Sequence, residues 1–107
     1  MTGSTAAAYD AVRYLLTSPA LGDRCRPMLV GDGFEWPALL AEAEAMSGGQ
    51  RLLVHVAYDL WEAEGVVGIS KLARGLDQTN FDRVVTALRL YRGDDAADSR
   101  AALRDAA

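Results

Sequence analysis

Residues 66–93 read VVGISKLARGLDQTNFDRVVTALRLYRG, and this stretch decides the fold because it signals two helices joined by a short turn. Ser70 is predicted to cap a brief helix that ends at Gly75. Asp77 or Thr79 then caps a longer helix that stops at Gly93. This second helix carries large apolar residues at helical spacing, namely Phe81, Val84, Val85, Leu88 and Tyr91. The pattern predicts a helix-turn-helix-like pair in the C-terminal half.

Upstream of this pair, caps and apolar spacing predict three more helices, over about 5–17, 36–47 and 49–64. A loop rich in proline and glycine separates the first two helices, and the apolar residues 28–30 in this loop are expected to reach the core. Strand-forming runs of β-branched residues are nearly absent apart from the two valines at 66 and 67 with Ile69, so at most a scrap of sheet is expected.

The chain as a whole is predicted to be an all-α, compact single-domain bundle of about five helices. Its 107 residues suffice for one modest core, and alanine and leucine, which favour helices, dominate its apolar residues. We expect residues 1–93 to form this domain. Residues 94–107 read as an acidic, alanine-rich tail that is frayed or forms a short helix, because an isolated helix of this length is marginal in water.

The segment 66–93 resembles the winged helix of the multiple-antibiotic-resistance regulators. The likeness lies in the Ile-Ser-x-Leu-Ala start at residue 69, the Leu-Asp pair at 76 and the Arg-Val-Val run at 83. It continues through the closing Arg-Gly at 92. The resemblance implies a transcription regulator that binds double-stranded DNA through the second helix of the pair.

On this resemblance, amide, hydroxyl and guanidinium groups of the second helix face outward and read base edges. Basic residues near both ends of the pair contact phosphates and set the position of the protein. The implied DNA-binding residues are Lys71, Arg74, Gln78, Thr79, Asn80, Arg83, Thr86 and Arg89.

The charge distribution supports DNA binding only locally. Residues 70–92 hold five basic side chains against two acidic ones, whereas the whole chain has a net charge of −4. A winged helix has a basic β-hairpin after the second helix, but this chain continues with Gly93-Asp94-Asp95. A local basic island of this kind can meet a phosphate backbone, while the acidic total argues against general binding to polyanions.

The rival prediction is a protein-interaction adaptor or a homodimer without nucleic-acid binding. The helix over 49–64 is apolar around most of its circumference, which is typical of a helix that is central to the core or covered by a partner. The residues expected to contact such a partner are Leu53, Val54, Tyr58 and Trp61.

The run Met46-Ser-Gly-Gly-Gln-Arg51 resembles the signature motif of ATP-binding cassette proteins. The chain has no G-x-x-x-x-G-K-[ST] loop to hold a nucleotide, and a Ser-x-x-Gln capping box from Ser47 to Gln50 accounts for the same residues. We therefore interpret this run as the start of a helix.

No enzyme, metal site or cofactor is predicted. His55 is the only histidine, and with Asp59 one turn later it supplies fewer ligands than a zinc site needs. Cys25 is the only cysteine, so no intramolecular disulfide can form, and a single reduced thiol favours a cytoplasmic protein. The N-terminal residues do not read as a signal peptide, and no apolar run approaches the ~20 residues that span a bilayer.

Overall fold

Five α-helices form the protein in a computed structural model that describes residues 5–31, 33–63, 65 and 67–93. They are α1 (Thr5–Leu16), α2 (Trp36–Glu44), α3 (Gly48–Glu62), α4 (Ile69–Gly75) and α5 (Gln78–Arg92). The predicted all-α bundle is confirmed, and the tail over 94–107 lies outside the described residues.

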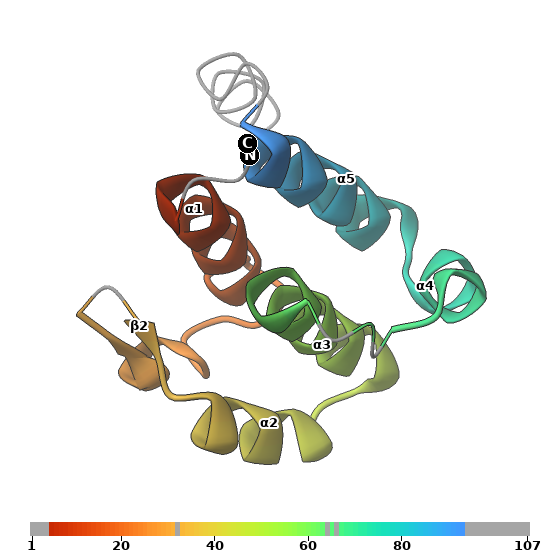
Figure 1. The fold of residues 1–107 in the computed structure, drawn as a ribbon. Coiled ribbons are helices and arrows are strands. Elements are labelled where there is room, and N and C mark those ends of the chain that lie inside the picture. Colours follow the sequence, from red (N-terminus) through yellow and green to blue (C-terminus); the bar gives the residue numbers. More distant parts are fainter. Residues whose placement is uncertain (1–4, 32, 64, 66, 94–107) are drawn as a thin grey trace.

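The core lies where α1, α3 and α5 meet. Helix α1 packs against both α5 and α3, and α2 packs against α3 on the other side (Figure 1). The side chains at the centre have no exposed surface, because each lies on the inner face of its helix. They include Val12, Leu15, Leu16, Leu39, Leu53 and Val54.

The segment between α1 and α2 contains structure that the sequence did not predict. A single 3₁₀ turn (Arg26–Met28) leads into a two-stranded antiparallel sheet of β1 (Leu29–Val30) and β2 (Gly33–Phe34). Met28 and Leu29 pack against the core as expected, but Val30 is 54% exposed, so the expectation for that residue is wrong. Val30 is the second of the two residues of β1, and its side chain is the exposed one of the pair.

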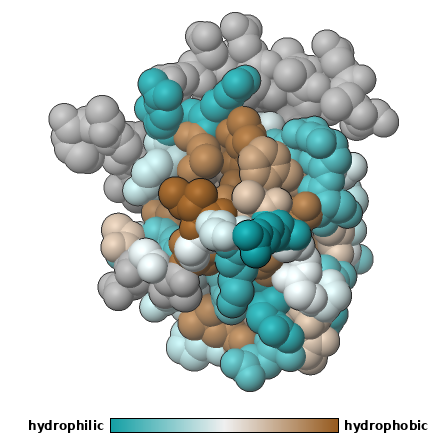
Figure 2. Space-filling view, turned by 90° about the vertical axis from the view of Figure 1, so that its right-hand side faces the viewer, coloured by the Kyte–Doolittle hydropathy of each residue, from teal (hydrophilic) through white to brown (hydrophobic). Residues whose placement is uncertain are grey.

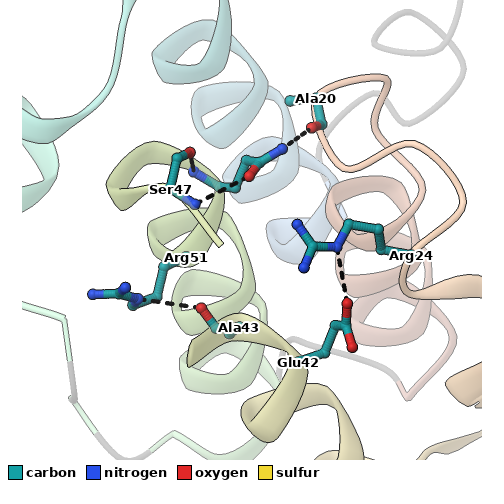
Figure 3. Close-up of polar contacts among 7 residues, drawn as sticks. Ala20, Arg24, Glu42, Ala43, Ser47 and Arg51 are labelled. Carbon is teal, nitrogen blue, oxygen red and sulfur yellow. Dashed lines mark hydrogen bonds and ion pairs between the residues drawn. The ribbon is translucent and has the colours of Figure 1, made fainter. Parts of the chain in front are cut away.

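Hydrogen bonds fix the junction between α2 and α3 (Figure 3). The backbone N–H of Gln50 donates to Ser47 Oγ at 3.3 Å, and the Ser47 N–H donates to Gln50 Oε1 at 3.1 Å, which confirms the capping box. The Gln50 amide also donates to the carbonyl of Ala20 at 2.8 Å. Arg51 donates to the Ala43 and Met46 carbonyls at the end of α2, both at 3.2 Å. The resemblance to a nucleotide-binding signature is therefore explained by a helix cap.

Candidate interaction surface

Helices α4 and α5 form the predicted pair, with only Leu76 and Asp77 between them. Asp77 caps α5 by accepting a hydrogen bond from the Asn80 backbone N–H at 2.8 Å. Gly93 ends α5 in the left-handed conformation, at φ 80°. The cap of α4 differs from the prediction, because Gly68 and not Ser70 precedes the first helical residue. The other expected feature, a strand at residues 66 and 67, is absent at Val67, and residue 66 lies outside the described part.

Helix α4 lies close to the start of α3. A Cβ atom added at Gly75 would stand 2.5 Å from Leu52 Cδ1, so the glycine permits this approach. None of the residues of α4 is buried, and Ile69 is 83% exposed. The short helix therefore sits on the surface of the bundle and adds little to its core.

The implied DNA-binding residues divide into two groups. Five are exposed, and three are partly buried. The exposed ones are Lys71, Arg74, Gln78, Thr79 and Arg89, and the partly buried ones are Asn80, Arg83 and Thr86. The structure therefore does not bring all eight to one open surface.

Arg83 and Thr86 lie on the side of α5 that meets α1. Burial raises the pKa of the Tyr14 phenol, while Arg83 and Thr86, both beside its hydroxyl, oppose this rise. The expectation that these two side chains face outward is wrong, because a helix that packs on α1 turns them toward the interface. The exposed residues near the start of α5 include the acidic Asp82. Its Oδ1 accepts a hydrogen bond from Gln78 Nε2 at 2.9 Å.

Basic side chains do gather on α4. Lys71 and Arg74 line an open hollow together with Gly68, Ser70 and Gly75. Both side chains are exposed, and no ion pair is found for either among the described residues. The hollow is a place where an anionic group can approach two cations.

The predicted partner surface on α3 is absent, because the chain covers it itself. Leu53 and Val54 have no exposed surface. Tyr58 and Trp61 are partly buried in an aromatic cluster, with ring centroids 5.2 Å from Trp36 and 4.9 Å from Phe34 respectively. Helix α3 is apolar because α1, α2 and the small sheet pack around it, and the expectation that Leu53 and Val54 contact a partner is wrong.

A different apolar surface is present on α5. Its inner stripe is Val84, Ala87 and Leu90, which are buried. The residues Phe81, Val85 and Leu88 form an outer stripe, at the i, i+4, i+7 spacing of one helix face. Phe81 and Val85 are partly buried, yet neither belongs to the described side chains that pack against the core, and Leu88 is 44% exposed. The sequence does not reveal this second stripe directly, because its apolar residues and those of the inner stripe alternate along one helix.

Figure 2 faces the side of the molecule on which α4 and α5 lie. Figure 2 shows brown, apolar surface in the upper half of this side, with teal side chains above it and to its right. Basic residues continue the stripe toward the end of α5, since Arg89 and Arg92 follow Val85 and Leu88 at i+4 and both are exposed.

His55 and Asp59 lie one turn apart in α3. Asp59 Oδ2 accepts a hydrogen bond from the Val67 backbone N–H at 2.7 Å, which ties the connection before α4 to α3. Burial, assisted by Arg51, lowers the pKa of His55. In the part of the chain that the structure describes, no three His, Cys, Asp or Glu side chains are placed to hold a metal ion.

Comparison with known proteins adds no assignment. No protein-family model, curated protein or solved structure matches this chain. Among the described residues, no helix combines the length and the apolar character needed to cross a membrane.

Proposed function

We propose that this protein is a non-catalytic, helix-turn-helix-like interaction module that binds another protein through α4 and α5. The observation that carries this proposal is the outer stripe of α5, which the fold leaves outside its core. A large apolar side chain that moves fully from water into an interface contributes about 1.5–3 kcal/mol, and the partly buried side chains of the stripe contribute less than this. Three such residues at helical spacing, with Ile69 exposed on the neighbouring helix, provide the apolar centre that a protein interface needs.

Two further observations support the proposal that the protein is non-catalytic and cytoplasmic. The single histidine is partly buried and its neighbour Asp59 accepts a hydrogen bond from the Val67 backbone, so among the described residues this pair offers no free acid and base for catalysis. Cys25 is buried and free, and burial raises the pKa of its thiol, as suits a structural cysteine in the reducing cytoplasm.

Site-specific photo-crosslinking in the cells that produce the protein tests the proposal. A photoreactive phenylalanine replaces Val85 on the outer stripe and, in a matched control, Ala41 on the exposed side of α2. We expect discrete crosslinked protein adducts from position 85 and none of the same size from position 41. Equal patterns from both positions, or no adduct from position 85, would contradict the proposal.

DNA binding is the second candidate function, because Lys71 and Arg74 line a hollow on α4 and Gln78 and Thr79 are exposed at the start of α5. This candidate extends the resemblance to the multiple-antibiotic-resistance regulators. Binding through these cations releases counterions, so affinity falls steeply as salt rises.

A fluorescence anisotropy titration with mixed genomic DNA fragments at low salt tests this candidate. The variant Lys71→Ala/Arg74→Ala should weaken binding and reduce the salt slope by about two units, one for each phosphate contact. The control Arg13→Ala changes an exposed cation on α1 and should leave binding unchanged. Absence of binding by the unmodified protein would eliminate the candidate.

A further inference from the structure

We infer that the partner supplies an amphipathic helix with acidic flanks, which lays its apolar side along the outer stripe of α5. This inference rests on the proposed protein-binding function and specifies the occupant of the same surface. It follows from the shape of the stripe, from the charges beside it and from the distribution of charge over the chain.

The shape of the stripe matches a helix. Phe81 and Leu88 are seven residues apart on one straight helix, which places them about 10 Å apart along its axis. A row of side chains with this spacing forms a ridge that packs into the groove of a second helix. Helices that bind in this way anchor themselves by apolar residues at i, i+3 or i+4, and i+7. An extended peptide has no comparable fit, because the β1–β2 sheet is only two residues long and lies on other elements.

The charges select an acidic helix. Arg89 lies beside the stripe, one turn after Val85, and is exposed. Lys71 and Arg74 are exposed on α4, the helix that precedes α5 by two residues. Asp82 is an exposed carboxylate in the first half of α5 and accepts a hydrogen bond from Gln78, so the positive charge on this helix is concentrated toward its end, at Arg89 and Arg92. Carboxylates that flank the apolar side of a bound helix can therefore pair with Arg89, while Lys71 and Arg74 add positive charge on the preceding helix.

The distribution of charge over the whole chain argues against a second copy as occupant. Residues 70–92 hold four exposed basic side chains and two exposed acidic ones, and residues 1–69 hold four basic and nine acidic side chains. Two copies joined through their α5 helices in a symmetric dimer would place two basic segments against each other. Like charges across an interface are unfavourable, so an acidic partner fits this surface better than the same surface of a second molecule.

The experiment measures binding of labelled amphipathic peptides to the full chain by fluorescence anisotropy. The probe is a helical peptide of about 18 residues, five turns long, with leucines along one side and glutamates along both flanks. One reference peptide has lysine in place of every glutamate, and another has the probe's composition in a scrambled order. We expect saturable binding of the acidic probe alone, which weakens as salt screens the charges.

Two pairs of variants locate the contact. Leu88→Asp places a charge on the stripe and should weaken binding by about ten-fold or more, as loss of an anchor does. Its control, Val30→Asp, makes a similar change at another exposed apolar position. Arg89→Glu reverses a charge beside the stripe and should weaken binding about five-fold at low salt and less at high salt. Its control, Arg13→Glu, reverses a charge on α1.

The outcomes separate this inference from the proposed function. If the acidic and lysine peptides bind equally, or if the two control variants weaken binding as much as Leu88→Asp and Arg89→Glu, the inference is wrong. If no peptide binds but position 85 still gives crosslinked adducts, the occupant is wrong while the protein-binding function stands. If light scattering shows a dimer that Leu88→Asp dissociates, the occupant is a second copy and the inference is overturned.

Discussion

Ala63 ends α3 in a conformation that alanine rarely adopts. Its φ is 58°, in the left-handed region, and its N–H donates to the Asp59 carbonyl at 2.7 Å. An L-residue pays about 1–2 kcal/mol for this conformation, and glycine does not. We expect Ala63→Gly to raise the free energy of unfolding by up to about 1 kcal/mol, as measured by urea denaturation.

The control is the same substitution in a helix interior. Ala41 is exposed within α2, so Ala41→Gly should lower the free energy of unfolding by up to about 1 kcal/mol. Opposite signs for the two variants are the expected result. A loss of stability in both would show that Ala63 carries no conformational strain.

His55 makes the stability of the protein depend on pH. Burial lowers its pKa from the ordinary value of 6.5, Arg51 and Lys71 lower it further, and Asp59 and Glu44 oppose them. The folded state thus binds the proton less tightly than the unfolded chain. Its contribution to stability is complete above pH 6.5 and is lost as the pH falls through 6.5 toward the lower pKa of the folded state.

Urea denaturation at a series of pH values measures this effect. The free energy of unfolding should decrease between about pH 7.5 and 5.5, and His55→Gln should flatten this part of the curve. The loss is modest, because His55 is only partly buried. An unchanged slope in the variant would assign the dependence to other groups.

At the residue scale, the sequence identified helix positions better than side-chain directions. Asp77, Ser47 and Gly93 end or begin helices as predicted, because caps depend on residues within one turn. The direction of Arg83 depends on where α1 lies, and no local pattern contains that information. The burial of Leu53 and Val54 likewise depends on how α1, α2 and the small sheet pack around α3, which no local pattern reveals.

At the scale of the element, α3 depends on its N-terminal cap. Ser47 and Gln50 satisfy two backbone N–H groups reciprocally. We expect Ser47→Ala to cost about 1 kcal/mol of stability, because one of those groups loses its acceptor. Thermal or urea denaturation measures this change.

Ser70 provides the matched control for the cap. It is exposed in α4 and is not the N-cap of that helix. Ser70→Ala should therefore change the free energy of unfolding by less than about 0.5 kcal/mol. If both serine variants lose the same stability, the capping box does not account for the effect at Ser47.

The elements that the sequence missed are those with weak local signals. The two strands are two residues each, too short for an alternating pattern, although a Gly-Asp pair between two apolar pairs is a known hairpin signal. Helix α5 showed the opposite problem. Its apolar residues cover more than one face of the helix. The outer stripe becomes visible only when Val84 is placed on the core side and Val85 on the other side.

At the scale of the molecule, the residues that form the core and the residues of the proposed interaction surface lie on different helices or on different sides of one helix. Helices α1, α3 and α5 contact one another and enclose the core, whereas α4 has no buried residue. The N-terminal part, residues 1–69, holds most of the core, whereas residues 70–92 hold the outer stripe of α5 with the exposed Leu88. A fold arranged in this way can change its α4–α5 surface without losing its core, which suits an interaction module.

Two leucines on α5 test this separation within one helix. Leu90 is 3% exposed in the core, and Leu88 is 44% exposed on the outer stripe. Leu90→Ala removes buried methyl groups and should cost about 2–5 kcal/mol of unfolding free energy. Leu88→Ala should cost about 0.5 kcal/mol or less, because the side chain is not part of the core. Urea denaturation of both variants gives the comparison. In protein that remains folded, the crosslinking yield from position 85 should fall for Leu88→Ala and stay unchanged for Leu90→Ala. Equal losses of stability at the two positions would place Leu88 in the fold rather than on an interface.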